Sequence, residues 1–367
     1  MCAGTARSRN PLRSRRPSKP SRRSKWTSAA FRASCTAAND MDRDEAYRKL
    51  TPGWASWGSR LPAFGHPLLC WIVGAWWFVT DIAKGRVPHI EAIRQACKVG
   101  SFEAWRIFFM TRVHHALNLL HFASFVGMDD AALGQWAAAR TTVINADRID
   151  EALDAGRPVI LLLVSFALHY PGLINCGAHQ RWTRREVCVV QPEAALGPLT
   201  AIGFYERLSR VSGRRIYGVQ ADSQTVAIKV ARAVGAGALI AMRVDSLPTQ
   251  TPSFVESTLC GRPSMFPLNL LALASKLGAE LIPFSVVREG TRFITQLHEP
   301  SRLTSGATAD DYTRVAAELD ACIGRLIRAN PGQYTAWSAV AEKWRMAREI
   351  QEHLRSGNSH LGATGEH

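Results

Sequence analysis

The segment Pro158–Gly172, P-V-I-L-L-L-V-S-F-A-L-H-Y-P-G, decides the fold class of this chain. Its apolar run predicts a buried strand over Val159–Phe166, because strands covered on both faces are almost continuously hydrophobic. The run is interrupted by Ser165, and His169 follows four residues later. Ligands of parallel sheets bind beyond the carboxyl ends of the strands. We therefore expect a functional site beside Ser165.

The same type of pattern recurs from about residue 141 onward, where short apolar runs alternate with helical patterns. This alternation predicts an α/β fold with a mainly parallel central sheet flanked by helices. The other expected strands are Val187–Gln191, Arg215–Val219, Leu239–Val244, Leu281–Val287 and Arg292–Glu299. The expected helices are Leu196–Ser212, Thr225–Val234, Pro267–Leu277, Ala309–Arg328 and Gly332–Leu354.

A strongly apolar segment, Leu61–Thr80, precedes this region and is uncharged for its last 14 residues. That length is short of the ~20 residues that span a bilayer. Three tryptophans in or beside it, Trp71, Trp76 and Trp77, suit a membrane interface. The segment predicts a helix that lies in or dips into the membrane, with a helix of the protein core as the alternative. An amphipathic helix is expected next, over Glu103–Val126.

Charge is concentrated at the amino-terminal end of the chain. Residues 1–40 contain ten Lys or Arg and one acid, a net charge of +9 out of +15 for all 367 residues. This Ser-, Pro- and Arg-rich segment cannot bury a core and is expected to be disordered. It is interpreted as a solvated tail, with a nucleic-acid arm, a lipid tether or a transit peptide as alternatives. No specific nucleic-acid partner is expected, because no stacking platform or helix-turn-helix accompanies it.

Four segments follow from these patterns: a basic tail (1–40), a membrane-associated helical segment (41–140), an α/β domain (141–357) and a disordered tail (358–367). The eight cysteines are scattered, without C-x-x-C pairs or Cys/His clusters at metal-ligand spacing. We therefore expect a reducing compartment, no metal site and no disulfide framework. No pattern specifies an oligomeric state.

Several segments, in their order, resemble the late acyltransferases of lipid A biosynthesis, a branch of the glycerolipid acyltransferases, from about residue 55 to about 350. Val244-Asp245 followed by Pro248 resembles the family's D-Q-x-P turn, with Ser246 in place of Gln. Leu259–Pro263 resembles F-F-G-x-P. The helix and strand Asn269–Pro283 and the ending N-P-G-Q-Y-T-A-W, within Leu326–Trp337, also have counterparts in the family.

The family's catalytic motif, H-F-G-N-W-E, falls on S-F-A-L-H-Y, Ser165–Tyr170. Its His is the general base and its acid orients that His, so the base position is Ser165 and the acid position is Tyr170. A hydroxyl acceptor needs a base poised near neutral pH, which Ser cannot supply. Tyr170, with an ordinary pKa of ~10, cannot replace a carboxylate.

Three accounts of this altered motif are open. The protein has lost acyl transfer and binds acyl chains, lipid or acyl-carrier protein; or His169 has become the base, supported by Asp245 or Tyr170; or Ser165 is a nucleophile activated by His169. Purely structural interpretations are a helix-capping Ser165, a helix-start His169 and a turn at Pro171-Gly172. For Asp245, the structural interpretation is turn initiation.

The resemblance implies acyl transfer from acyl-carrier protein or acyl-CoA to an anionic lipid of the lipid A type, at the cytoplasmic face of the inner membrane. It implies no cofactor besides the acyl thioester as co-substrate. Basic residues suit an acidic carrier or a lipid phosphate, so the expected substrate-binding residues are Arg243, Arg207, Arg210 and Arg214. Arg243 directly precedes Val244-Asp245, at an apolar strand end where an unpaired charge is costly.

Overall fold

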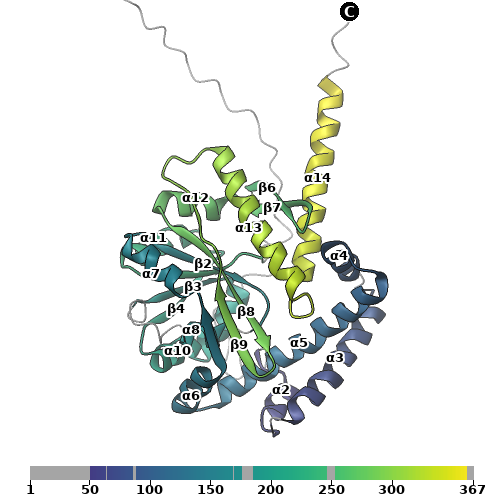
Figure 1. The fold of residues 1–367 in the computed structure, drawn as a ribbon, viewed down its shortest axis with the longest axis vertical. Coiled ribbons are helices and arrows are strands. Elements are labelled where there is room, and N and C mark those ends of the chain that lie inside the picture. Colours follow the sequence, from purple (N-terminus) through teal and green to yellow (C-terminus); the bar gives the residue numbers. More distant parts are fainter. Residues whose placement is uncertain are drawn as a thin grey trace, which may run out of the picture. The chain divides into compact units, whose positions relative to one another are not determined.

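The computed structural model describes residues 50–62, 64–85, 88–167, 169–175, 185–245 and 253–361. The predicted basic tail therefore lies outside the described residues. A series of helices comes first (Figure 1): α2 (Gly53–Gly58), α3 (Gly65–Ala83), α4 (Pro88–Cys97), α5 (Ser101–Gly127) and α6 (Asp130–Arg140).

A mostly parallel sheet follows, as the alternating pattern predicted. Its strand order is β1-β9-β8-β2-β5-β3-β4, and β10 pairs with β8. Strand pairs are parallel except for β8 with β9 and β10 with β8. The strands are β1 (Thr141–Ile144), β2 (Val159–Val164), β3 (Val187–Gln191), β4 (Ile216–Gln220), β5 (Leu239–Arg243), β8 (Glu280–Glu289), β9 (Arg292–Leu297) and β10 (Ser301–Arg302).

Helices cover both faces of this sheet (Figure 1). They are α7 (Asp147–Asp154), α8 (Tyr170–Asn175), α9 (Glu193–Ala201), α10 (Phe204–Ser212), α11 (Val226–Gly235), α12 (Leu268–Leu277) and α13 (Ala309–Ala329). The last helix, α14 (Trp337–Leu361), packs mainly against β7 (Arg262–Pro267) and α4. Alternate residues of β2 enter two different cores, with Leu162 in one and Leu161 in the other. The strand is therefore buried on both faces, which explains its unbroken hydrophobicity.

The helix α5 joins the amino-terminal helices to the sheet. Its first turns contribute Phe108 to one sheet core, its last turns contribute Phe125 to the other, and its middle packs against α3 through Val113. Gly74 of α3 permits this contact, because a Cβ there would lie 2.8 Å from the Val113 Cα. The hydrophobic side chains of α5 thus connect the amino-terminal helices to the cores on both faces of the sheet.

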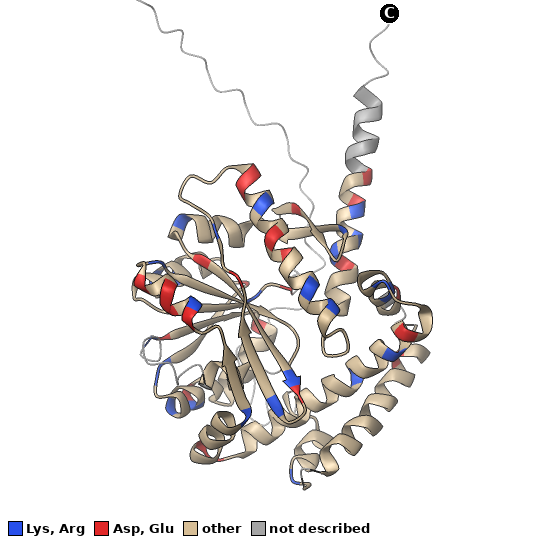
Figure 2. Cartoon of the chain, in the orientation of Figure 1, with Lys and Arg blue, Asp and Glu red and all other residues tan. Residues whose placement is uncertain are grey.

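The outer face of α3 is apolar and exposed. Leu68, Ile72, Trp76 and Val79 are each at least 60% exposed and recur at helical spacing along one side. Figure 2 shows how few charges α3 carries. By length and composition α3 is the one described helix able to cross a membrane, and only 17% of its apolar window is buried. The alternative interpretation, a helix of the protein core, does not fit this exposure.

Four local features differ from what the sequence led us to expect. The expected helix Leu196–Ser212 is two helices, because Gly203 adopts a left-handed conformation between α9 and α10. Pro171-Gly172 is not a turn but the first turn of α8, where proline is tolerated. A hairpin, β6 (Phe254–Leu259) with β7 (Arg262–Pro267), was not predicted. The helix α14 continues to Leu361, into the tail predicted to be disordered.

Candidate functional site

The candidate site begins where β2 and β5 end side by side. These strands are parallel neighbours, with Leu163 opposite Arg243, so the residues that follow them emerge at the same edge of the sheet. Ser165 donates two hydrogen bonds to Asp245, from its backbone N to Oδ2 (2.7 Å) and from its Oγ to Oδ1 (2.8 Å). Both residues are buried. The Asp245 carboxylate therefore fixes Ser165 rather than orienting His169.

Two residues that the sequence did not single out hold the loop after β2. Thr335 donates to the Ser165 carbonyl from both its backbone N (2.8 Å) and its Oγ1 (3.0 Å). Asn118 of α5 donates from Nδ2 to the Phe166 carbonyl (3.0 Å). Thr335 lies in the N-P-G-Q-Y-T-A-W segment that resembles the family ending, so the sequence did indicate that this segment is important, although not which of its residues. Nothing in the helical pattern of α5 distinguished Asn118.

A second buried polar layer lies behind Asp245. Lys343 of α14 is 2% exposed and donates to the Val244 carbonyl (3.2 Å). Asp320 of α13 is fully buried, and burial raises the pKa of its carboxyl group. The nearby positive charge of Lys343 makes this rise smaller. Burial also raises the pKa of Tyr334 well above its usual value, and the Asp245 carboxylate adds to this effect. Buried charges need such partners, so this layer fixes β5 against α13 and α14.

A cavity of about 290 Å³ opens in front of Ser165. Its polar lining comes from the strand ends and from α5 and α8: Ser165, His169, Tyr170, Gln191, Arg243, Asn118 and His115. Its apolar lining includes Leu119, Phe122 and Leu199. An apolar cavity with a few converging polar groups is the usual form of a small-molecule site. It brings together four residues that the sequence singled out, Ser165, His169, Tyr170 and Arg243, with Asp245 directly behind Ser165.

His169 lies immediately before α8, and its Nε2 is buried without a hydrogen-bond partner. Burial, and secondarily the positive charge of Arg243, lower its pKa to about 3. The imidazole is therefore neutral at pH 7 and able to accept a proton, although its basicity is weak. Among the described residues, no carboxylate forms a hydrogen bond or ion pair with it.

Tyr170, at the acid position of the motif, is part of an aromatic cluster. Its ring packs against His169 (centroids 4.2 Å apart) and Phe204 (4.7 Å). Gln191 donates to its hydroxyl at 3.5 Å, and burial raises its pKa. A protonated phenol cannot supply the negative charge that a carboxylate gives to a catalytic histidine. Tyr170 instead forms part of the cavity wall.

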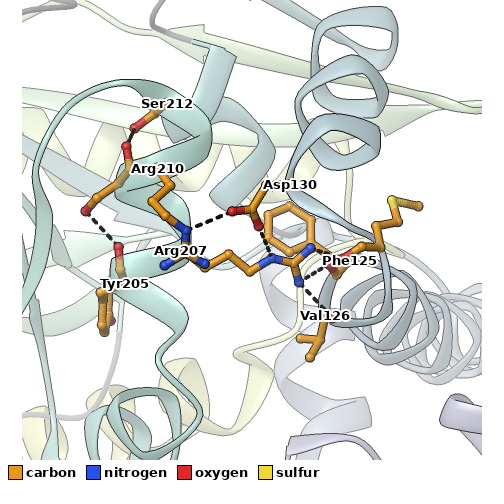
Figure 3. Close-up of polar contacts among 9 residues, drawn as sticks. Phe125, Val126, Asp130, Tyr205, Arg207, Arg210 and Ser212 are labelled. Atoms are coloured by element: carbon orange, nitrogen blue, oxygen red, sulfur yellow. Dashed lines mark hydrogen bonds and ion pairs between the residues drawn. The ribbon is translucent and has the colours of Figure 1, made fainter.

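Arg243 is exposed at the end of β5 and lines the cavity. The other three arginines predicted to bind substrate do not line it. Arg207 donates to the Phe125 carbonyl (2.9 Å), the Val126 carbonyl (2.7 Å) and Asp130 (3.0 Å), as Figure 3 shows. Arg210 pairs with the same Asp130.

Arg214 has an internal role as well. It is 5% exposed and donates to the Leu173 carbonyl of α8. Arg207 and Arg214 therefore satisfy backbone carbonyls at the ends of α5 and α8, as buried guanidinium groups commonly do. Both arginines therefore make their polar contacts within the protein. Of the four arginines that were predicted to bind substrate, Arg243 is the one that lines the cavity.

The fold and the strand-end cavity define an α/β protein of the kind whose ligands bind at the carboxyl edge of a parallel sheet. The sequence matches the family described as bacterial lipid A biosynthesis acyltransferase over residues 119–339, well over half of the chain. The chain therefore belongs to the bacterial lipid A biosynthesis acyltransferase family. The match includes every residue of the cavity except Leu50, His115 and Asn118. No curated protein matches the sequence.

Proposed function

We propose that this protein transfers an acyl group from a carrier thioester to a hydroxyl of a lipid A-type acceptor at the cytoplasmic face of the inner membrane. The donor would be acyl-carrier protein or acyl-CoA, and no other cofactor would take part. One observation carries the proposal: in a member of an acyltransferase family, the altered motif still lines a partly apolar cavity with a neutral histidine.

In this proposal His169 is the base. The acceptor hydroxyl gives its proton to Nε2, and its oxygen attacks the thioester carbonyl carbon. The C–S bond then breaks, and the imidazolium returns the proton to the departing thiolate. Arg243, exposed at the same cavity, would bind the anionic part of the donor or the acceptor. Because the pKa of His169 is low and no described carboxylate contacts it, the imidazolium would form at a high free-energy cost. We therefore expect turnover well below that of a relative with an intact motif.

A second candidate function is binding without turnover, as a catalytically inactive relative that holds an acyl chain, lipid or acyl-carrier protein. The specific observation that favours it is the Ser165–Asp245 pair. Both oxygens of this carboxylate accept hydrogen bonds from Ser165, and among the described residues no hydrogen bond joins Asp245 to His169. The hydrophobic wall of the cavity would serve binding equally well.

Acyl transfer by residues 41–367 in detergent tests these alternatives. The assay supplies acyl-carrier-protein thioesters and total membrane lipid, and acylated lipid is detected by mass spectrometry. A product that His169→Gln abolishes, and that Arg302→Gln leaves unchanged, supports His169 as the base. Arg302 is a suitable control because it is exposed on β10, outside the cavity.

The variant Ser165→His with Tyr170→Glu restores the family's base and acid. Product from this variant alone, with none from the native protein, would establish the inactive relative. Product that survives His169→Gln would contradict both His169 as the base and the account in which His169 activates Ser165.

We also propose that α3 places the cavity at the membrane. Its exposed apolar face carries Trp71 and Trp76, whose amphipathic rings suit the interface, and Figure 2 shows little charge along it. Asp81, a charged residue of α3, is buried and paired with Arg112 of α5 (2.7 Å), so its charge does not face the lipid.

A further inference from the structure

A second cavity, of about 430 Å³, lies on the other side of α5 from the Ser165 site and has no role in the proposed reaction. It is bounded by α2, the first turn of α3, the last turns of α5, and α6. Its lining residues are Ser56, Ser59, Arg60, Leu61, His66, His121, Ala123, Ser124, Gly127, Met128, Trp136 and Arg140.

Positive charge in this cavity is unbalanced. Arg60 and Arg140 line it together with His66 and His121, and its lining contains no Asp or Glu. Neither arginine forms an ion pair with a described residue; Arg140 lies over the Trp136 ring, 5.5 Å from its centroid. By contrast, Arg207 and Arg148, two largely buried arginines elsewhere in the described chain, are each paired with an acid. Two arginines that line one cavity without an acidic residue provide the net positive charge that an anion site needs.

A buried polar atom in the same cavity also lacks a partner. His121 Nδ1 is inaccessible to solvent and forms no hydrogen bond within the described residues. Burial, and secondarily the positive charges of Arg288 and Arg140, lower the pKa of His121 to about 3. The guanidinium groups of Arg60 and Arg140 therefore repel additional positive charge, and a bound anion would relieve that repulsion.

We propose that this cavity binds a phosphate monoester or inorganic phosphate through Arg60 and Arg140. Two guanidinium groups match the two negative charges of such a phosphate and bind its oxygens in a bidentate manner. The site is distinct from the acyl-transfer cavity, so its existence does not depend on catalysis.

The source of the phosphate is indicated by what surrounds the cavity. Trp57, Phe64 and Leu68, each within two residues of a lining residue in sequence, are 60%, 86% and 67% exposed. An apolar surface beside a cationic cavity suits a lipid whose chains lie in the membrane and whose head group carries the phosphate. This assignment to a lipid rests on the membrane contact proposed above; the phosphate site does not.

Binding measurements without any acyl donor test the proposal. Inorganic phosphate is titrated into the detergent-solubilised full chain by calorimetry. Separately, the chain is floated with phosphatidylcholine vesicles that contain either phosphatidic acid, a monoester, or phosphatidylglycerol, a diester, at equal vesicle charge. Arg140→Gln and Arg60→Gln are compared with Arg302→Gln. Arg60 is exposed, so its replacement leaves the fold intact even if Arg140→Gln disturbs the Trp136 contact.

We expect each cavity variant to weaken binding about tenfold, since a charge-assisted hydrogen bond is lost, while Arg302→Gln has no effect. Phosphate binding in calorimetry would identify a site for free phosphate. Preference for phosphatidic acid without binding of free phosphate would identify a head-group site. Absence of both, or equal losses in Arg60→Gln and Arg302→Gln, would overturn the proposal. Since no thioester is present, none of these outcomes depends on whether acyl transfer occurs.

Discussion

Asp245 is the residue that fixes the geometry at the end of β2. It accepts from the Ser165 backbone and side chain, and Lys343 holds the adjacent Val244 carbonyl. The side chains of Ser165, Asp245 and Lys343 are all buried. Removal of the Asp245 carboxylate would therefore leave the two hydrogen-bond donors of Ser165 without partners.

We predict that Asp245→Ala lowers the free energy of unfolding by about 3 kcal/mol or more. Asp245→Asn, which keeps one acceptor, should lower it by about 1–3 kcal/mol. The control is Glu151→Ala, an exposed acid on α7, which should change it by less than about 0.5 kcal/mol. Chemical denaturation followed by circular dichroism measures all three. Equal stabilities of Asp245→Ala and the native protein would contradict this role.

Gly172 is required by close packing and not by a turn. A Cβ at this position would lie 2.5 Å from Thr295 Oγ1 and 3.2 Å from Phe284 Cζ, on β9 and β8. We predict that Gly172→Ala destabilises the protein by about 1–3 kcal/mol through overpacking. The matched change Gly127→Ala, where a Cβ meets nothing within 4 Å, should be neutral or stabilising by up to about 1 kcal/mol. Thermal melts of both variants decide this, and a neutral Gly172→Ala would show that α8 can shift.

At the scale of elements, the exposed face of α3 predicts membrane binding. Leu68→Lys, Ile72→Lys and Trp76→Lys together place three charges on that face, where insertion into lipid is costly. We expect vesicle binding in flotation to fall at least about tenfold. Ile228→Lys on α11, a position that is 55% exposed, is the matched control and should bind as the native chain does. A triple variant that still floats would contradict the interfacial role of α3.

Strands β2, β3 and β4 were predictable from sequence because each is a short apolar run followed by a helical pattern, whereas β1 and β10 were not predicted. Strand β3 was predicted to the residue, and β2 was predicted two residues too long because Ser165 and Phe166 remain buried after the strand ends. The hairpin β6–β7 was missed because neither strand is strongly apolar, and it is covered by α13 and α14 rather than by the main sheet.

Only part of the site could be predicted. Ser165, His169 and Arg243 were found because they follow apolar runs on the sheet. Lys343 was not, since a lone lysine in an amphipathic helix is ordinarily exposed, and its burial depends on the carbonyl that β5 presents to it. Arg207 was predicted to bind substrate because the sequence shows its charge. The sequence does not show the backbone carbonyls of Phe125 and Val126, which accept its hydrogen bonds in the folded protein.

At the scale of the whole molecule, buried histidines make stability depend on pH. Burial lowers the pKa of His114 and His298 to about 4 and of His121 and His169 to about 3, from 6.5 in the unfolded chain. The folded protein therefore binds fewer protons than the unfolded chain over this range. Stability is complete above about pH 6.5 and is lost as the pH falls towards 4.

We predict that each of these histidines contributes up to about 1.4 kcal/mol of lost stability per pH unit in that window. His298→Gln, which can keep the bond to Ser285 (2.8 Å), should flatten the dependence by the share of one histidine. Denaturation curves at a series of pH values, for the native protein and this variant, measure the two slopes. Identical slopes would contradict the assignment of His298 as a buried neutral group.

The pairing of β1 with β9 has a consequence for biosynthesis. Thr141–Ile144 lies alongside Phe293–Gln296, and β2 likewise pairs with β8. A ribosome must add about 150 residues after β1 before β9 leaves the exit tunnel, which takes roughly 8 to 30 s at ordinary elongation rates. During that time the apolar strand β2 has no β8 beside it. The nascent chain therefore needs shielding from aggregation, and a polypeptide terminated before β9 would be a target for chaperones and proteases.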